Sequence, residues 1–409
     1  MPEETAFPNP WALDPRIRRT GDTYYFAGEL LVAAQDVPRL TGLLGPLRTI
    51  GRASGDPLAA FVTRVAVPDG DDGVETDLPS LVSSMRSLSA GPRIGLNHAF
   101  AANTAAPMLA GGIPIEGQPK LHGGTATDPL PVADEPDAAP VTGARTVRVA
   151  VIDTGIDPVA LTTALFDRPL KHGVHEPDPV YQDPATHVIG LMGGHGTAAA
   201  GVVARYARNC ELTSIQVLSV NGITDELGLA AGILRAHDAG AEIISMSLGG
   251  TFEGEAPPLA LELVLDSLPK QTVVVAAAGN VDRPAPKFYP ASRPGVISVA
   301  AIDTTGPAPV PAGFSNTGDW ITVCAPGVRA HMPYVSGTWP FGTVPLEFHG
   351  AVAWSGTSFA TPFVAARIAA TTMPGQTCRE AADLLLQGLP NPFPGYGRFL
   401  DAPAGFVHP

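Results

Sequence analysis

The stretch Gly356-Thr357-Ser358-Phe359-Ala360-Thr361-Pro362 decides more about this 409-residue chain than any other. Its serine stands between small residues at the expected start of a helix, and Pro362 follows within the first turn. A serine hydroxyl is chemically idle until a base removes its proton. An active Ser358 therefore needs three further groups from the chain: a base, a residue that orients the base, and donors for an oxyanion.

Two upstream motifs supply candidates for the base and for the residue that orients it. Val149-Ala150-Val151-Ile152-Asp153-Thr154-Gly155 places a carboxylate where a buried strand is expected to end, and Gly193-Gly194-His195-Gly196-Thr197 places a histidine at a helix start. Alone, Asp153, His195 and Ser358 each have an ordinary explanation as a capping or packed residue. Together they follow the order Asp, His, Ser, and glycine or small neighbours clear space around each one. That order is typical of one class of serine hydrolase.

These three motifs resemble those of the subtilase (subtilisin-like serine protease) family, and the resemblance extends from about Val147 to the C-terminus. It implies that Ser358 attacks the scissile carbonyl, that His195 takes and returns the proton, and that Asp153 fixes the imidazole. The implied activity is that of a serine endopeptidase, which hydrolyses peptide bonds of a polypeptide substrate through an acyl-enzyme intermediate.

The same resemblance assigns residues to the oxyanion and to the substrate. Ala276-Ala277-Ala278-Gly279-Asn280 matches the family's oxyanion-hole segment, so the amide of Asn280 is expected to act with the backbone N–H of Ser358. Ser245-Met246-Ser247-Leu248-Gly249-Gly250 resembles the strand that pairs with the substrate backbone. The small residues of both segments predict a roomy, apolar S1 pocket. The residues expected to contact the substrate are Ser247, Leu248, Gly249, Ala277 and Gly279.

From Val147 onward, apolar stretches of strand length alternate with segments of helical pattern. Runs such as Thr272-Val273-Val274-Val275 are typical of strands buried on both faces. The pattern predicts an α/β domain with a doubly wound, mainly parallel sheet, whose chemistry lies at the carboxyl ends of the strands, and the resemblance implies that this domain is subtilisin-like. Strands are expected at Val147–Ile152, Leu212–Val220, Glu242–Met246, Thr272–Ala278, Val296–Ala301 and Trp320–Cys324. Helices are expected at residues 195–207, 225–239, 257–268, 357–371 and 377–388.

The first 98 residues follow a different pattern. Strands are expected at Tyr24–Ala34, Leu47–Gly51, Ala59–Val67 and Arg93–His98, with one helix that Asp36 caps and a second helix that Asp77 caps. The order βαββαβ predicts a small α+β module of the ferredoxin-like kind. The chain is therefore expected to divide into this module at 1–98, a Pro/Gly-rich linker at 99–145 and the catalytic domain at 146–409.

Subtilases are often made with a propeptide of this element order, which blocks the active site. The resemblance therefore implies that the N-terminal module is an intramolecular inhibitor and that the chain is, or derives from, a zymogen. Two other functions stay open: a catalytically quiet peptide-binding scaffold of the same fold, and an esterase of the α/β-hydrolase kind. The esterase is disfavoured because the segment around Ser358 lacks the second glycine of G-x-S-x-G, and because this serine follows the histidine.

Composition narrows the partners and cofactors. A net charge of −14 argues against nucleic acid and anionic membranes. Met1-Pro2-Glu3-Glu4 lacks the basic start of a secretory signal and no stretch approaches 18 apolar residues, so a cytoplasmic location is expected. Cys210, Cys324 and Cys378 are expected to be buried free thiols. No cofactor or metal is expected: Lys171-His172-Gly173-Val174-His175-Glu176 is a solvated loop without a completing ligand. Some subtilases bind structural calcium, but the Asp-x-Asp-x-Asp-Gly pattern is absent.

Overall fold

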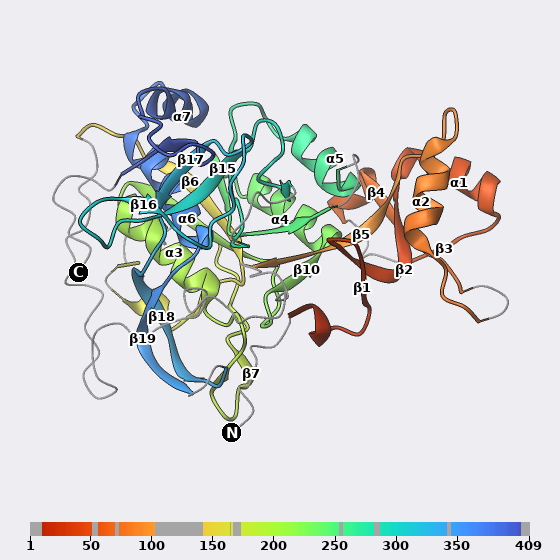
Figure 1. The fold of residues 1–409 in the computed structure, drawn as a ribbon, viewed down its shortest axis with the longest axis horizontal. Coiled ribbons are helices and arrows are strands. Elements are labelled where there is room, and N and C mark those ends of the chain that lie inside the picture. Colours follow the sequence, from red (N-terminus) through yellow and green to blue (C-terminus); the bar gives the residue numbers. More distant parts are fainter. Residues whose placement is uncertain are drawn as a thin grey trace.

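The structure, a computed structural model, describes residues 10–50, 56–69, 73–102, 142–163, 165–166, 173–252, 257–281, 287–341 and 345–401. A larger C-terminal α/β unit and a smaller N-terminal module lie side by side along the long axis of the molecule (Figure 1). Most of the predicted linker, residues 103–141, lies outside the described residues, so the domain boundaries stay a prediction.

The C-terminal unit is built on a sheet in which neighbouring strands of the main path are all parallel, in the order β20-β17-β15-β13-β11-β6-β9. The short strand β16 (Val310–Pro311) adds an antiparallel pair to β15. This confirms the predicted mainly parallel sheet. The strands of the path are β6 (Val147–Asp153), β9 (Cys210–Gln216), β11 (Ile243–Met246), β13 (Val273–Ala277), β15 (Ile297–Asp303), β17 (Val323–Pro326) and β20 (Arg398–Phe399).

Helices cover this sheet in packed pairs. α3 (His195–Tyr206) packs against α6 (Thr357–Thr371), and α4 (Glu226–Asp238) packs against α5 (Leu259–Ser267). α7 (Cys378–Gln387) lies against α6 and begins at a capping box that Thr377 and Glu380 form, which satisfies backbone donors of its first turn. The five helices begin and end within two residues of their predicted bounds.

A hairpin of two long strands was missing from the sequence prediction. β18 (Ala330–Trp339) and β19 (Leu346–Trp354) pair antiparallel, with β7 (Tyr181–Asp183) and β8 (Val188–Ile189) beside them. The hairpin leads directly into α6, so it sets the direction from which the chain approaches Ser358 (Figure 1).

The N-terminal module has the predicted element order. Its strands and helices are β2 (Thr23–Ala33), α1 (Val37–Leu44), β3 (Arg48–Thr49), β4 (Val62–Ala66), α2 (Leu78–Ser87) and β5 (Ile94–Ala102), and the unpredicted β1 (Ile17–Thr20) pairs with β2. Asp77 caps α2 as expected, because its carboxylate accepts from the N–H of Ser80. Asp36 does not cap α1 with its side chain; its carboxylate binds Arg93 instead, at 3.0 Å. Short 3₁₀ helices lie at Pro10–Leu13, Ala34–Asp36, Pro57–Ala60 and Ala160–Thr162.

Strand β5 joins the two units into one sheet. It was expected to end at His98, but it continues to Ala102 and is buried along its whole length. Its last residues pair antiparallel with β10 (Ile223–Asp225) and with β12 (Leu248–Thr251), which pairs in turn with β14 (Phe288–Tyr289). The sheet of the N-terminal module therefore extends into the C-terminal unit (Figure 1).

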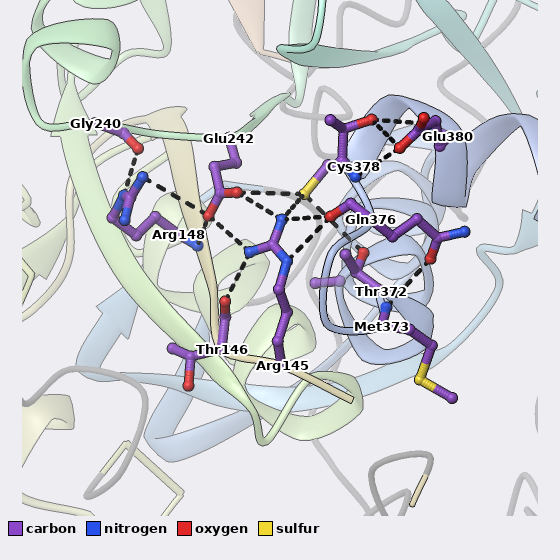
Figure 2. Close-up of polar contacts among 12 residues, drawn as sticks. Arg145, Thr146, Arg148, Gly240, Glu242, Thr372, Met373, Gln376, Cys378 and Glu380 are labelled. Carbon is purple, nitrogen blue, oxygen red and sulfur yellow. Dashed lines mark hydrogen bonds and ion pairs between the residues drawn. The ribbon is translucent and has the colours of Figure 1, made fainter. Parts of the chain in front are cut away.

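A cluster of polar residues links the start of the C-terminal unit to its last helix (Figure 2). We call it the Arg145 cluster; its members are Arg145, Arg148, Glu242, Gln376 and Cys378. Arg145 lies just before β6, and its guanidinium donates to the Glu242 carboxylate at 2.7 Å and to the Gln376 carbonyl at 3.2 Å. It also lies 3.6 Å from the Cys378 sulfur.

The structure confirms the prediction made for the cysteines. Cys210, Cys324 and Cys378 are buried free thiols, as expected, and burial raises the pKa of Cys210 and of Cys324 to about 12. Among the described residues, no helix has the length and apolar character needed to span a bilayer.

Candidate active site

The predicted base and its orienting carboxylate are in contact. Asp153 ends β6, His195 begins α3, and both side chains are fully buried. Nδ1 of His195 lies 2.8 Å from Oδ1 of Asp153, which also accepts from the N–H of Thr154. A carboxylate only accepts, so Nδ1 carries the ring proton and Nε2 is left as the acceptor. Within the described residues, Nε2 has no hydrogen-bond partner.

Two aromatic rings that sequence reasoning missed hold the imidazole in place. The ring of Trp354, at the end of β19, meets that of His195 edge-on at 5.3 Å, and the ring of Phe359 lies at 5.4 Å. Phe359 follows Ser358 directly, so the helix that carries the serine also packs the histidine. A ring confined in this way keeps the rotamer in which Nδ1 faces the carboxylate.

A second buried carboxylate, that of Asp178, forms hydrogen bonds with residues next to Asp153 and next to His195. Oδ2 of Asp178 accepts from the Thr154 hydroxyl at 2.7 Å and from the N–H of Gly194 at 3.0 Å, and the Thr154 hydroxyl accepts from the N–H of Gly196. Burial, with the nearby charge of Asp153 as a further cause, raises the pKa of Asp178 well above its usual range. The local pattern Glu176-Pro177-Asp178 carries no signal of this role.

The nucleophile candidate is the second residue of α6 and is almost completely buried. Pro362 is the sixth residue of this helix, rather than part of its first turn as expected, and it has no N–H to bond the Ser358 carbonyl four residues earlier. The hydroxyl of Ser247 donates to that carbonyl instead, at 2.7 Å. The Ser358 hydroxyl in turn lies 3.5 Å from the Ser247 carbonyl.

The predicted oxyanion residue lies beside the segment that carries Ser358. Oδ1 of Asn280 accepts from the N–H of Thr357 at 2.8 Å, which fixes the amide so that Nδ2 is the free end. Nδ2 is buried and has no partner within the described residues. Asn316, which sequence reasoning missed, holds the loop: it donates to the Ala278 carbonyl and accepts from the N–H of Val281. Gly279 has φ +98, and a Cβ there would lie 2.5 Å from the Asn316 amide.

Two of the residues predicted to contact the substrate lie on a strand that pairs with β5. Leu248 lies opposite Ala102 and Gly249 opposite Ala101, in antiparallel register. Ser247 stands between β11 and β12, and Ala277 ends β13, which continues into Gly279. A side chain at position 249 would collide with the Phe288 ring at 2.2 Å, so the close approach of β14 requires glycine there.

No metal site accompanies this arrangement in the described part of the chain, where no group of three His, Cys, Asp or Glu side chains is placed to hold an ion. Lys171 and His172 of the expected solvated loop lie outside the described residues. Glu176 is tied down rather than solvated, because its carboxylate binds Arg235 at 3.0 Å and accepts from the N–H of Gln216.

Comparison with known proteins finds a matching family model and similar chains. The model of the subtilase family matches residues 144–387, which is more than half of the chain. The thermophilic serine proteinase of Bacillus sp. (strain AK1) is 32% identical over 60% of this chain and 57% of its own length. Thermitase of Thermoactinomyces vulgaris is 35% identical over 42% of this chain and 58% of its own length. The chain thus spans somewhat more than half the length of these relatives.

The fold has a solved counterpart. The crystal structure of fervidolysin from Fervidobacterium pennivorans, described as a keratinolytic enzyme related to subtilisin, aligns with a TM-score of 0.60. The alignment covers 97% of this chain and 64% of that one, at 20% identity, which speaks for the fold alone. With the family model matched over the segment that holds Asp153, His195, Asn280 and Ser358, this chain belongs to the subtilase family.

Proposed function

We propose that this chain is a serine endopeptidase that cleaves polypeptides through an acyl-enzyme intermediate. One observation carries the proposal: the buried Asp153–His195 pair and the Nδ2 of Asn280, which has no hydrogen-bond partner among the described residues, belong to the strand ends and helix starts around Ser358. A buried donor and a buried acceptor without partners are costly unless a ligand satisfies them. A substrate carbonyl and the serine proton would satisfy both.

The chemistry follows from the free atoms. Ser358 Oγ attacks the substrate carbonyl while its proton moves to Nε2 of His195, and Asp153 balances the imidazolium. Nδ2 of Asn280 and the N–H of Ser358 stabilise the oxyanion; the leaving amine then takes the proton from His195, and water hydrolyses the acyl-enzyme. Because the Ser358 hydroxyl faces the Ser247 carbonyl, a rotation about its Cα–Cβ bond precedes the attack.

The N-terminal module is proposed to act as an intramolecular inhibitor and the chain as a zymogen. Support comes from β5, which pairs with β12 where a substrate strand would pair, and from side chains that cross the contact between the units. The amide of Asn97 donates to the carboxylate of Asp225 at 3.1 Å, and the Thr251 hydroxyl donates to the Asp22 carbonyl. While β5 stays in place, another polypeptide has no free edge to join.

The activity is tested by labelling with a fluorophosphonate and by casein digestion. The wild-type chain is expected to be labelled and to digest casein, whereas Ser358→Ala does neither. Ser336→Ala, which changes an exposed serine, retains both activities. Asn280→Ala lowers turnover by about 10²–10³, a scale set by the corresponding change in subtilisin itself. A wild-type chain that binds peptides without labelling or digestion is a scaffold, and the proposal is then wrong.

Self-processing is tested by the intact mass of wild type and Ser358→Ala. With Ala102 opposite Leu248, the next residue of a strand in this register stands opposite Ser247, beside the nucleophile. We therefore expect wild type to be cut first between Asn103 and Thr104, and Ser358→Ala to stay at full length. If wild type digests casein yet both chains keep their full mass, maturation by self-cleavage is wrong.

A further inference from the structure

The carboxylate of Glu226 lies at the contact between the two units, and one of its two contacts comes from the N-terminal module. Glu226 is the first residue of α4, and its side chain is completely buried. Its Oε2 lies 2.6 Å from Nδ1 of His98 on β5, and its Oε1 accepts from the N–H of Ala260, in the first turn of α5, at 2.6 Å. One of the two contacts is thus internal to the catalytic unit, and the other comes from the N-terminal module.

The groups around Glu226 favour a negatively charged side chain. Glu226 lies at the N-termini of both α4 and α5, where the positive ends of two helix dipoles favour negative charge. Two further charged groups act on it: Arg86 of α2, which belongs to the N-terminal module, and Glu262 of α5, which has the same sign as Glu226 and binds Arg293 at 2.8 Å. Without β5, Glu226 keeps the N–H of Ala260 and the two helix N-termini but loses its contact with His98.

His98 stands where a polypeptide bound in the register of β5 would place one of its side chains. β5 runs antiparallel to β12, and successive side chains of a strand alternate between faces, so His98, Phe100 and Ala102 share one face. The ring of Phe252 contacts both aromatic members of this set, His98 at 4.6 Å and Phe100 at 5.5 Å. A polypeptide bound in the register of β5 puts its own side chains into these two positions.

We propose that Glu226 is a specificity-determining residue, whose carboxylate binds a cationic side chain of the substrate six residues before the bond that is cut. The count follows from the register: the residue opposite Ser247 is the first before the cut, the one in the place of Ala102 the second, and the one in the place of His98 the sixth. The inference rests on the proposed endopeptidase function and on β5 as a substrate mimic.

The test uses internally quenched peptides that copy residues 95–108 of the chain, with His, Ala or Glu in the place of His98. They are cleaved by the full-length gene product at pH 6, where a peptide histidine is largely protonated. The ratio of kcat/KM between two peptides on one enzyme preparation does not depend on how much of it has an open cleft. We expect the His peptide to exceed the Ala peptide about tenfold and the Glu peptide up to about a hundredfold, the range of a charged hydrogen bond.

Two variants separate recognition from folding. Glu226→Gln keeps an acceptor for the Ala260 N–H but removes the charge, so the His-to-Glu ratio should fall towards one. Asp238→Asn, an exposed position at the far end of the same helix, removes one negative charge and should leave the ratio unchanged. If wild type cleaves all three peptides equally, the inference is overturned while the proposed function stands; if it cleaves none, the proposed function fails and the inference with it.

Discussion

Glu226 begins α4 and Glu242 immediately precedes β11, yet these two acidic residues are held in different ways. Glu242 is bound by Arg145 and Arg148, which belong to the same unit, and its side chain is 24% exposed (Figure 2). Glu226 is completely buried, and its cationic partner candidate, His98, comes from the other unit. The contacts of Glu242 stay within one unit. Glu226, in contrast, loses its contact with His98 once β5 departs, and a substrate side chain can then bind to it.

The largest effect should come from separating His98 and Glu226. In the Ser358→Ala background, which keeps the chain whole, a double-mutant cycle of His98→Ala and Glu226→Ala should give a coupling of about 2–4 kcal/mol in urea unfolding. Removing one partner of a buried pair strands the other in a site without water. A coupling below about 0.5 kcal/mol would contradict the view that this pair holds the module in place.

Asp178 differs from both glutamates, because its described neighbours include hydrogen-bond donors but no basic side chain. Its pKa is raised in the folded state, so the folded chain holds a proton that the unfolded chain releases. The stability contribution is therefore present below about pH 4 and is lost as the pH rises through the folded pKa, by up to about 1.4 kcal/mol per pH unit.

Asp178→Asn removes this titration while keeping an acceptor for the Thr154 hydroxyl. Urea unfolding of the variant should therefore lose less stability than wild type between pH 5 and pH 7, with Asp319→Asn, at an exposed aspartate, as the control that keeps the wild-type slope. Equal slopes for wild type and Asp178→Asn would show that Asp178 is ionised without penalty.

The interaction of Arg145 with Glu242 should stabilise the fold less than the interaction of His98 with Glu226. Burial raises the pKa of Glu242, the hydrogen bonds and charges of Arg145 and Arg148 lower it, and the balance lies below the usual range. A cycle of Arg145→Ala and Glu242→Ala should give a coupling of about 1 kcal/mol, because water screens these partly exposed groups. Half-molar salt should reduce it further. A coupling energy equal to that of His98 and Glu226 would contradict the expectation that the partly exposed pair is the weaker of the two.

Much of the catalytic unit was predictable because its signals are local. The β-branched run before Asn280 and the glycines around His195 mark a buried strand and a helix start within a few residues. The parallel sheet then follows, since strands that alternate with helices can hardly pair otherwise. The polar side chains at the strand ends meet because the sheet brings these ends to one edge.

What sequence reasoning missed depends on contacts between distant segments. Asp178 and Asn316 act through hydrogen bonds to backbone atoms far along the chain, and their own surroundings in the sequence are ordinary turn residues. The β18–β19 hairpin is interrupted by register shifts and glycines, which break the alternation that marks a strand. The extension of β5 to Ala102 was missed because its last residues are small, and only the edge offered by β12 makes them a strand.

The smallest effect is expected at Arg148, on the rim of the Arg145 cluster. Its guanidinium lies 3.8 Å from the Glu242 carboxylate, and its side chain is 52% exposed, so the attraction is screened by water and offset by the entropy of a long side chain. Arg148→Ala should therefore change urea unfolding by less than about 0.5 kcal/mol and leave the peptide ratios at Glu226 untouched. A loss as large as that of Arg145→Ala would mean that Glu242 needs both cations, and that its contacts act as a network rather than a single pair.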